Sequence, residues 1–276
     1  MNTISFMSAN FLAKESGYRL TGGWMEGDRA TNARFAPLEN FEILFAELLR
    51  QVCGMGFQAL DLWTAHLNPA WATPEHIAIA RRLLSQYQIQ VVSLAGSFGE
   101  TRDEFLAACR LAAALEVPLL GGSTPLLFHD RQFVIGALRQ DNLKLGYENH
   151  PERNGREVLS KIGDEGADCI GATVDTGCFG AEGYDAAAAI GELAGRIQHV
   201  HLRDVIGVGQ EESCRLGAGV VPIQACLGVL RDLDYRGPLS IEHEPETFDP
   251  TPDCVASLAQ VKAWLAGQQQ GYCTRD

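Results

Sequence analysis

Acidic residues and histidines stand near the ends of four apolar segments in the second half of the chain. Glu148 lies in LKLGYENH, Asp175 in IGATVDTG, His201 in IQHVHLRD and Glu242 in GPLSIEHE. Charged groups are costly to bury unless they are paired or coordinate a metal. Three carboxylates and one imidazole suit a divalent cation such as Mn²⁺, Mg²⁺ or Co²⁺ better than a structural Zn²⁺ site. We therefore expect these four residues to bind one divalent ion, with Zn²⁺ retained as an alternative.

The segment IQHVHLRD places two histidines two residues apart. In a strand such residues share a face, so His199 and His201 point the same way and His201 lies nearer the rim. Other roles stay open for single members of the set. Asp175 can cap the turn that follows its strand, His201 can be a hydrogen-bonded core histidine, and Arg203 can pair with a glutamate.

Short apolar runs alternate with helical patterns eight times along the chain. The expected strands are residues 4–11, 57–63, 89–96, 117–124, 143–150, 170–177, 197–204 and 237–244. Helix start signals lie between them, including Thr73-Pro74, the capping box Thr101 to Glu104, and Asp185. Eight repeats in about 250 residues predict a single-domain (β/α)8 TIM barrel. An open dinucleotide-binding sheet is disfavoured, because no G-x-G-x-x-G follows an early strand.

No linker divides the chain, so residues 1–276 are expected to form one domain. Two long connections, 12–36 and 205–221, follow the first and seventh strands and emerge at the carboxyl ends of the strands, where barrel enzymes place their sites. Loops of this length are usually functional or disordered. We therefore interpret 12–36 as a possible lid loop, and the polar tail 268–276 as loose.

Composition restricts the partners and the compartment. The net charge of −13 opposes binding to nucleic acid or an anionic membrane, and no run of about 18 apolar residues or secretory signal is visible. Eight cysteines without a C-x-x-C pair are expected to be reduced core thiols in a cytoplasmic protein. The expected partner is a small carbohydrate, with a homo-oligomer possible.

At the four ligand positions the sequence resembles the xylose-isomerase-like barrel superfamily, in particular its sugar phosphate isomerase/epimerase branch. The motifs are the Glu of GYENHP, the Asp of VDTG, the second His of HVHLRD and the first Glu of SIEHE, and the resemblance runs from ISFMSANF to LSIEHE. It implies one divalent metal, often Mn²⁺, on Glu148, Asp175, His201 and Glu242. It also implies that Glu148 and Glu242 are catalytic, moving a proton on opposite faces of the substrate carbon, as in the ketose 3-epimerases of this family.

Substrate contacts are expected at three further positions. The resemblance places a histidine three residues after Asp175, where this chain has Cys178. Arg215 in RLGAG can hold a substrate hydroxyl or phosphate, although a solvated loop arginine is an equal alternative. His66 in LWTAHLNP lies on the same rim, where it can contact substrate or cap a turn. The aromatic residues of the first long connection, Tyr18 and Trp24, can close over a sugar or simply anchor that segment.

These features predict a metal-dependent isomerase or epimerase of a small keto sugar or sugar phosphate, acting through an enediolate with two glutamates as acid and base. A dehydratase of keto-inositols or dehydroshikimate-like rings is the alternative on the same metal site. An apurinic-site endonuclease is disfavoured, because the chain has too few histidines for a three-zinc cluster and is acidic. A sugar-binding barrel without catalytic activity would have lost its metal ligands, and all four are present.

Overall fold

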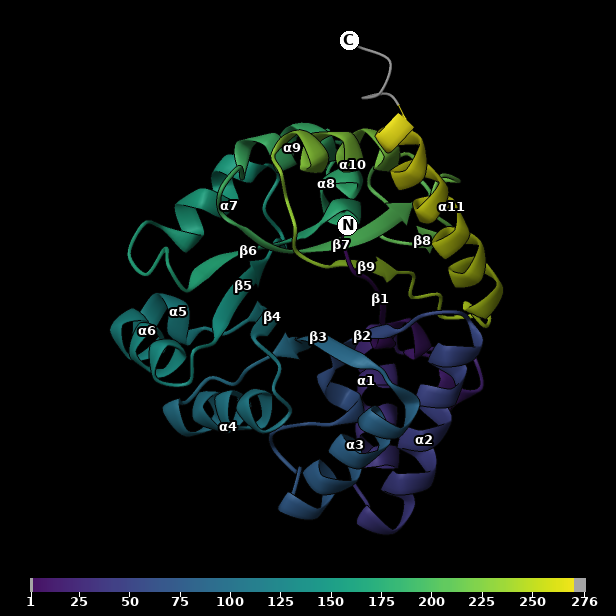
Figure 1. Ribbon diagram of the computed structural model, residues 1–276, viewed down its shortest axis with the longest axis vertical. Coiled ribbons are helices and arrows are strands. Elements are labelled where there is room, and N and C mark those ends of the chain that lie inside the picture. Colours follow the sequence, from purple (N-terminus) through teal and green to yellow (C-terminus); the bar gives the residue numbers. More distant parts are fainter. Residues whose placement is uncertain (1, 271–276) are drawn as a thin grey trace.

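The strands of the protein close into a barrel. The computed structural model describes residues 2–270, with side chains through residue 267. Within those residues eight parallel strands form the ring in Figure 1: β1 (Ile4–Met7), β2 (Ala59–Trp63), β3 (Gln90–Ser97), β4 (Leu119–Ser123), β5 (Lys144–Glu148), β6 (Ile170–Asp175), β7 (Ile197–Val205) and β9 (Leu239–Glu242). Strand β9 pairs with both β7 and β1, which closes the ring. The predicted (β/α)8 TIM barrel is confirmed, and a short strand β8 (Ser213–Cys214) pairs antiparallel with β7.

Helices surround the ring of strands (Figure 1). Their bounds are α1 (Trp24–Phe35), α2 (Leu38–Gly54), α3 (Pro74–Tyr87), α4 (Arg102–Ala114), α5 (Leu126–His129), α6 (Arg131–Gln140), α7 (Gly155–Ile162), α8 (Thr176–Ala181), α9 (Ala186–Glu192), α10 (Ile223–Asp232) and α11 (Thr251–Gln270). The predicted start signals are confirmed: Thr73 and Thr101 each complete a capping box, and Asp185 caps α9. No helix among the described residues is both long enough and apolar enough to cross a membrane.

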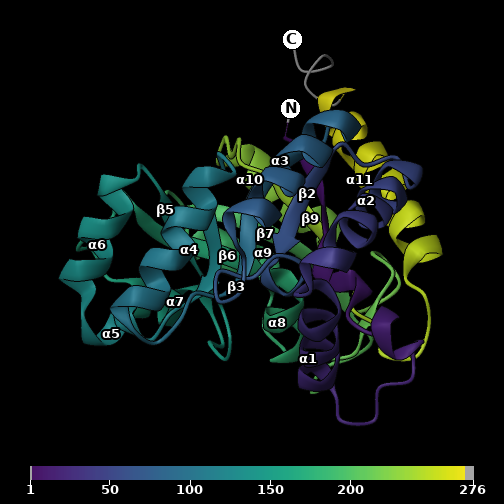
Figure 2. The same ribbon diagram turned by 90° about the horizontal axis from the view of Figure 1, so that it is seen from below.

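The first long connection differs from the sequence expectation. Residues 12–36 contain the short 3₁₀ helix η2 (Lys14–Ser16) and the twelve-residue helix α1 instead of an irregular loop. Helix α1 buries only Gly27, Thr31 and Phe35, so it lacks the apolar periodicity that identifies a helix in a sequence. Figure 2 shows α1 and α8 at one end of the barrel, away from both termini. Within the predicted loose tail, 268–270 end helix α11 and 271–276 lie outside the described residues.

The barrel encloses two kinds of interior. Apolar residues fill the space between helices and strands, with Phe6, Phe41 and Phe105 completely buried. Inside the ring, polar side chains from five strands are equally buried: Ser5, Asp61, Ser93, His199 and Ser240. A polar interior must satisfy its own hydrogen bonds, and it lies directly beneath the polar residues at the carboxyl ends of the strands.

Candidate active site

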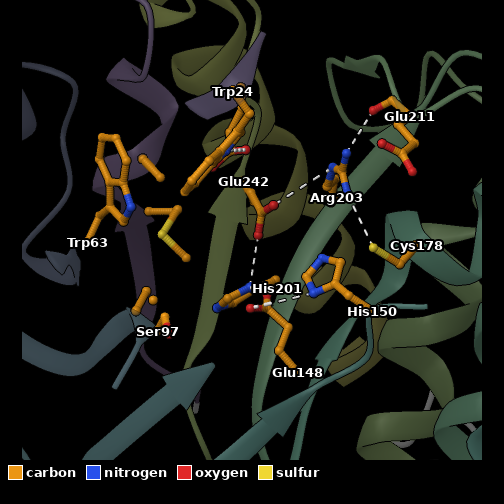
Figure 3. A pocket seen from close by; sticks show the side chains of 15 residues that line it. Trp24, Trp63, Ser97, Glu148, His150, Cys178, His201, Arg203, Glu211 and Glu242 are labelled. Atoms are coloured by element: carbon orange, nitrogen blue, oxygen red, sulfur yellow. Dashed lines mark hydrogen bonds and ion pairs between the residues drawn. The ribbon is translucent and has the colours of Figure 1, made fainter. Parts of the chain in front are cut away.

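A cavity of about 360 Å³ opens at the carboxyl ends of the strands (Figure 3). One side, here called the acidic half, comes from β5 to β9 and the segments that follow them: Glu148, His150, Cys178, His201, Arg203, Glu211, Glu242 and Glu244. The other side, here called the apolar half, comes from β1 to β3, the turn after β1 and helix α1: Met7, Ala9, Trp24, Trp63, Ala95, Gly96 and one polar residue, Ser97. The volume lies in the range of small-molecule sites. A second cavity of about 400 Å³ adjoins it and shares Trp24, Arg203, Glu211 and Glu244.

Three of the four predicted metal ligands converge in the acidic half. Nδ1 of His201 lies 2.6 Å from Oε1 of Glu148 and 2.8 Å from Oε2 of Glu242. Apart from these ion-pair contacts, the buried Nδ1 of His201 and Oε2 of Glu242 have no hydrogen-bond partner. The three residues offer ligand atoms close enough together to hold one ion. Two carboxylates and one imidazole nitrogen therefore fit a divalent cation, by donor chemistry and by their lack of other partners.

The fourth predicted ligand, Asp175, lies in an adjoining cluster. Its Oδ2 accepts hydrogen bonds from Nη1 of Arg203 at 2.9 Å and from Sγ of Cys178 at 3.0 Å, and it lies 3.7 Å from Nε2 of His150. Its Oδ1 accepts from the backbone N–H groups of residues 177 and 178, so Asp175 also caps α8. The turn-capping role is present, and the metal role of Asp175 stays a prediction.

Charges in the acidic half shift the pKa of each carboxyl differently. Burial opposes ionisation of Asp175, but the Arg203 guanidinium outweighs it and lowers the pKa of Asp175 to about 2. Burial raises the pKa of Glu242, and the Asp175 carboxylate adds to that effect. Burial also acts to raise the pKa of Glu148, but His201 and then His150 outweigh it and lower that pKa. Burial followed by the Glu242 carboxylate raises the pKa of Glu244 to about 8.

His201 has a raised pKa. Burial alone would keep the ring neutral, but the carboxylates of Glu148 and Glu242 outweigh it and raise the pKa of His201 well above its ordinary value. When no other cation is bound, the protonated ring supplies the positive charge that pairs with the two carboxylates. A divalent ion would replace that proton, because the ligand form of histidine is the neutral ring.

The predicted substrate contacts lie in different places. Cys178 lines the cavity, beside Asp175 and Arg203. His66 is buried outside the cavity lining, where Nδ1 lies 3.1 Å from Oγ of Ser8, and burial lowers the pKa of His66 to about 3. Arg215 is exposed and lines neither of the two adjoining cavities. Of the three, the structure brings only Cys178 to the metal ligands, and all three remain predictions as substrate contacts.

The aromatic side chain predicted to close over a sugar, Trp24, lies above the cavity (Figure 3). Its Nε1 donates a hydrogen bond to Oε2 of Glu244 at 3.0 Å, and its ring packs edge-on against Trp63 with centroids 5.5 Å apart. Helix α1 is therefore connected to the acidic half through one hydrogen bond and to the apolar half through one aromatic contact. Tyr18 does not line the cavity.

Sequence reasoning assigned no site role to Asp61, Glu244 and Trp63. Asp61 lies in the middle of the apolar run FQALDLW, and the structure buries it completely. An isolated acid in an apolar strand is the sequence signal that could have identified it, because acids are rarely buried unless they are paired. Glu244 lies two residues beyond the end of β9 and lines the same cavity as Glu242. Trp63 ends β2 at the rim, in the same way that the predicted ligands end their strands.

Comparisons with known proteins agree on the architecture. The family model for the xylose isomerase-like TIM barrel matches residues 49–265. A D-tagatose 3-epimerase-like protein has a TM-score of 0.71 at 16% identity, covering 98% of this chain and 99% of its own. D-Allulose 3-epimerase from Methylomonas sp. has a TM-score of 0.66 at 14% identity, covering 95% and 98%. A probable 3-DHS dehydratase from Bacillus anthracis has a TM-score of 0.61 at 14% identity, covering 95% and 99%. No curated protein matches the sequence significantly.

Proposed function

Because the chain belongs to the xylose isomerase-like TIM barrel family, we propose that it is a divalent-metal-dependent epimerase or isomerase of a small keto sugar. The observation that carries the proposal is the convergence of Glu148, His201 and Glu242 in one cavity. The likeness to barrels described as sugar 3-epimerases supports the choice of reaction. The likeness itself concerns the fold, so the reaction rests on the residues in the cavity.

The proposed ion ligands are Glu148, Asp175, His201 and Glu242, with Mn²⁺ as the expected ion. When bound, such an ion supplies Lewis acidity, which makes a hydrogen beside the sugar carbonyl more acidic. Asp175 pairs with His201 in the β6–β7 register, and Arg203 lowers its pKa, so it is proposed as the fourth ligand. To join the set, its Oδ2 would exchange its contacts with Arg203 and Cys178 for the ion.

Glu148 and Glu242 are proposed to move the substrate proton. They enter the cavity from β5 and β9, on either side of His201 (Figure 3). Without an ion, their pKa values are shifted in opposite directions, downward for Glu148 and upward for Glu242. A base and an acid on two faces of one carbon invert that carbon through an enediolate, whereas a single base would transfer the proton between carbons.

The charge of the cavity favours an uncharged sugar over a sugar phosphate. Four carboxyl side chains line it: Glu148, Glu211, Glu242 and Glu244. Among the described residues that line the cavity, Arg203 is the only arginine or lysine. Its guanidinium is already engaged, because Nη1 donates to Asp175 and Nη2 donates to the backbone carbonyl oxygen of Glu211. A phosphate would need a free cationic group to bind here.

The decisive experiment follows substrate hydrogen exchange in D₂O. The protein is stripped of metal, reloaded with Mn²⁺ and incubated with a panel of ketoses and their phosphates, and deuterium incorporation is measured by mass spectrometry. We expect exchange and an epimer of unchanged mass formula for at least one free ketose, and no exchange in the chelated protein. If no member of the panel exchanges in the Mn²⁺-loaded protein, the proposed reaction is wrong.

The same samples test the alternative reaction. A dehydratase would release water and give an ultraviolet-absorbing enone from a keto-inositol or dehydroshikimate-like ring. The likeness to the barrel described as a probable 3-DHS dehydratase keeps this reaction in the panel. Enone formation without any epimer would replace the epimerase proposal while leaving the proposed metal site intact.

A further inference from the structure

A carboxylate inside the barrel contacts the back of the proposed metal-binding histidine. Asp61 on β2 is completely buried, and its Oδ2 lies 3.0 Å from Nε2 of His201, the ring nitrogen opposite the one that faces Glu148 and Glu242. The same oxygen lies 2.7 Å from Nε2 of His199. The side chain thus reaches across the ring from β2 to β7, and none of the site roles described above uses it.

Further hydrogen bonds hold the Asp61 carboxylate in place. Ser240 donates to Oδ2 at 3.0 Å, Ser93 donates to Oδ1, and Oγ of Ser5 lies 2.6 Å from Oγ of Ser240. Every group around the carboxylate can donate a hydrogen, and an ionised carboxylate can only accept. A nitrogen that faces it must therefore carry the proton. For His201 that nitrogen is Nε2, so in the neutral ring Nδ1 is left with its lone pair.

We propose that Asp61 is a positioning residue that holds His201 as the Nε2–H tautomer, with the Nδ1 lone pair directed at the cation. The inference rests on the proposed function, because it assigns Nδ1 of His201 as the ligand atom. Carboxylates that accept from the second nitrogen of a metal-binding histidine fix its tautomer and raise its basicity, and their loss usually weakens metal binding by about 10- to 100-fold. His199 shares the carboxylate but does not line the cavity, so it is not placed to present a ligand atom there.

The test compares Asp61→Asn with Ser5→Ala by calorimetric titration of the metal-free proteins with Mn²⁺. Asp61→Asn keeps the shape but removes the charge that accepts from the imidazole, and we expect about 10- to 100-fold weaker binding with one ion per chain. Ser5→Ala perturbs the same interior without touching Asp61 or His201, and we expect an affinity within about twofold of the unchanged protein. Circular dichroism of each variant establishes that it folds.

A second measurement needs no variant. Histidine ¹H–¹⁵N spectra of the protein, with and without diamagnetic Mg²⁺, should show a slowly exchanging proton on Nε2 of His201 in both states. An unprotonated Nε2 would overturn the proposal, and so would an Asp61→Asn protein that binds Mn²⁺ as tightly as the parent. Two Mn²⁺ ions per parent chain and one in Asp61→Asn would make Asp61 a ligand instead. If the parent binds no Mn²⁺, the proposed function fails, while the spectrum still decides the tautomer.

Discussion

The acidic and apolar halves of the cavity are built from the same kind of strand but differ in what the strand ends carry. In the acidic half, Glu148 ends β5, Glu242 ends β9 and His201 lies within β7. Charge holds these side chains together, and Nδ1 of His201 lies within 2.8 Å of both carboxylates. In the apolar half, the ends of β1 to β3 present Met7, Trp63 and Ala95, which are buried in a separate apolar cluster. One half can therefore bind an ion and move protons, while the other can only give shape to the space.

This division implies that substitutions in the two halves affect different kinetic constants. Groups that exchange protons with the substrate act in the transition state, so their loss lowers kcat. Groups that pack against the substrate equally before and during the reaction act on binding, so their loss raises KM. Helix α1 belongs to the apolar half but also contacts the acidic half, because Trp24 donates a hydrogen bond to Glu244 while it packs on Trp63.

The largest effect is expected from Glu148→Gln and Glu242→Gln. Each removes one proton-transfer group and should lower kcat by about 10²- to 10⁴-fold. Steady-state kinetics on the best ketose of the panel, with saturating Mn²⁺, measure the loss. The matched control is Glu39→Gln, which changes an exposed glutamate on α2 and should leave kcat unchanged. Activity near the parent level in either glutamine variant would contradict the two-glutamate mechanism.

The next effect is the pH dependence of metal binding. The carboxylates hold a proton on His201 with a raised pKa, and Mn²⁺ must displace it. Affinity should therefore rise with pH, by up to about tenfold per unit below that pKa, and level off above it. Calorimetric titration between about pH 6 and 8, in two buffers of different ionisation enthalpy, measures both the affinity and the proton released. An affinity that stays constant without proton release would show that His201 is not a ligand.

A smaller effect is expected from the apolar half. Trp24→Ala removes the ring above the cavity and should raise KM by about tenfold with kcat within about threefold, because the loss concerns packing. Trp24→Phe keeps a ring but cannot donate to Glu244, so it separates packing from the hydrogen bond. Recovery of the parent KM in the phenylalanine variant assigns the effect to packing. If Trp24→Ala instead lowers kcat more than it raises KM, the expectation that the two halves affect different kinetic constants is wrong.

The smallest effect is expected from Arg215→Ala. The side chain is exposed and outside both cavities, so KM should change by no more than about twofold. Cys178→Ala, inside the cavity and in contact with Asp175, provides the comparison and should raise KM by a few-fold. A tenfold rise in KM for Arg215→Ala would instead support the sequence-based expectation that this arginine binds substrate.

The barrel was predictable because each strand is a short apolar run and each intervening helix begins at a cap such as Thr101. The convergence of Glu148, His201 and Glu242 was predictable because an acid or histidine near the end of a buried strand has few structural roles. Asp61 was not, because its partner His201 lies 140 residues further along the chain and only the closed ring brings them together. Helix α1 was not, because it buries so few residues that it leaves no periodic pattern.

The hydrogen bonds around Asp61 also bear on how the chain matures during translation. The aspartate leaves the ribosome with β2, long before His199, which follows it by 138 residues, and Ser240, which follows it by 179. Until those later segments emerge, the Asp61 carboxylate lacks the hydrogen-bond donors of His199 and Ser240, and burying it would be more costly than leaving it in water. The barrel therefore cannot close around Asp61 before β9 has been synthesised, because that strand supplies Ser240 and completes the ring.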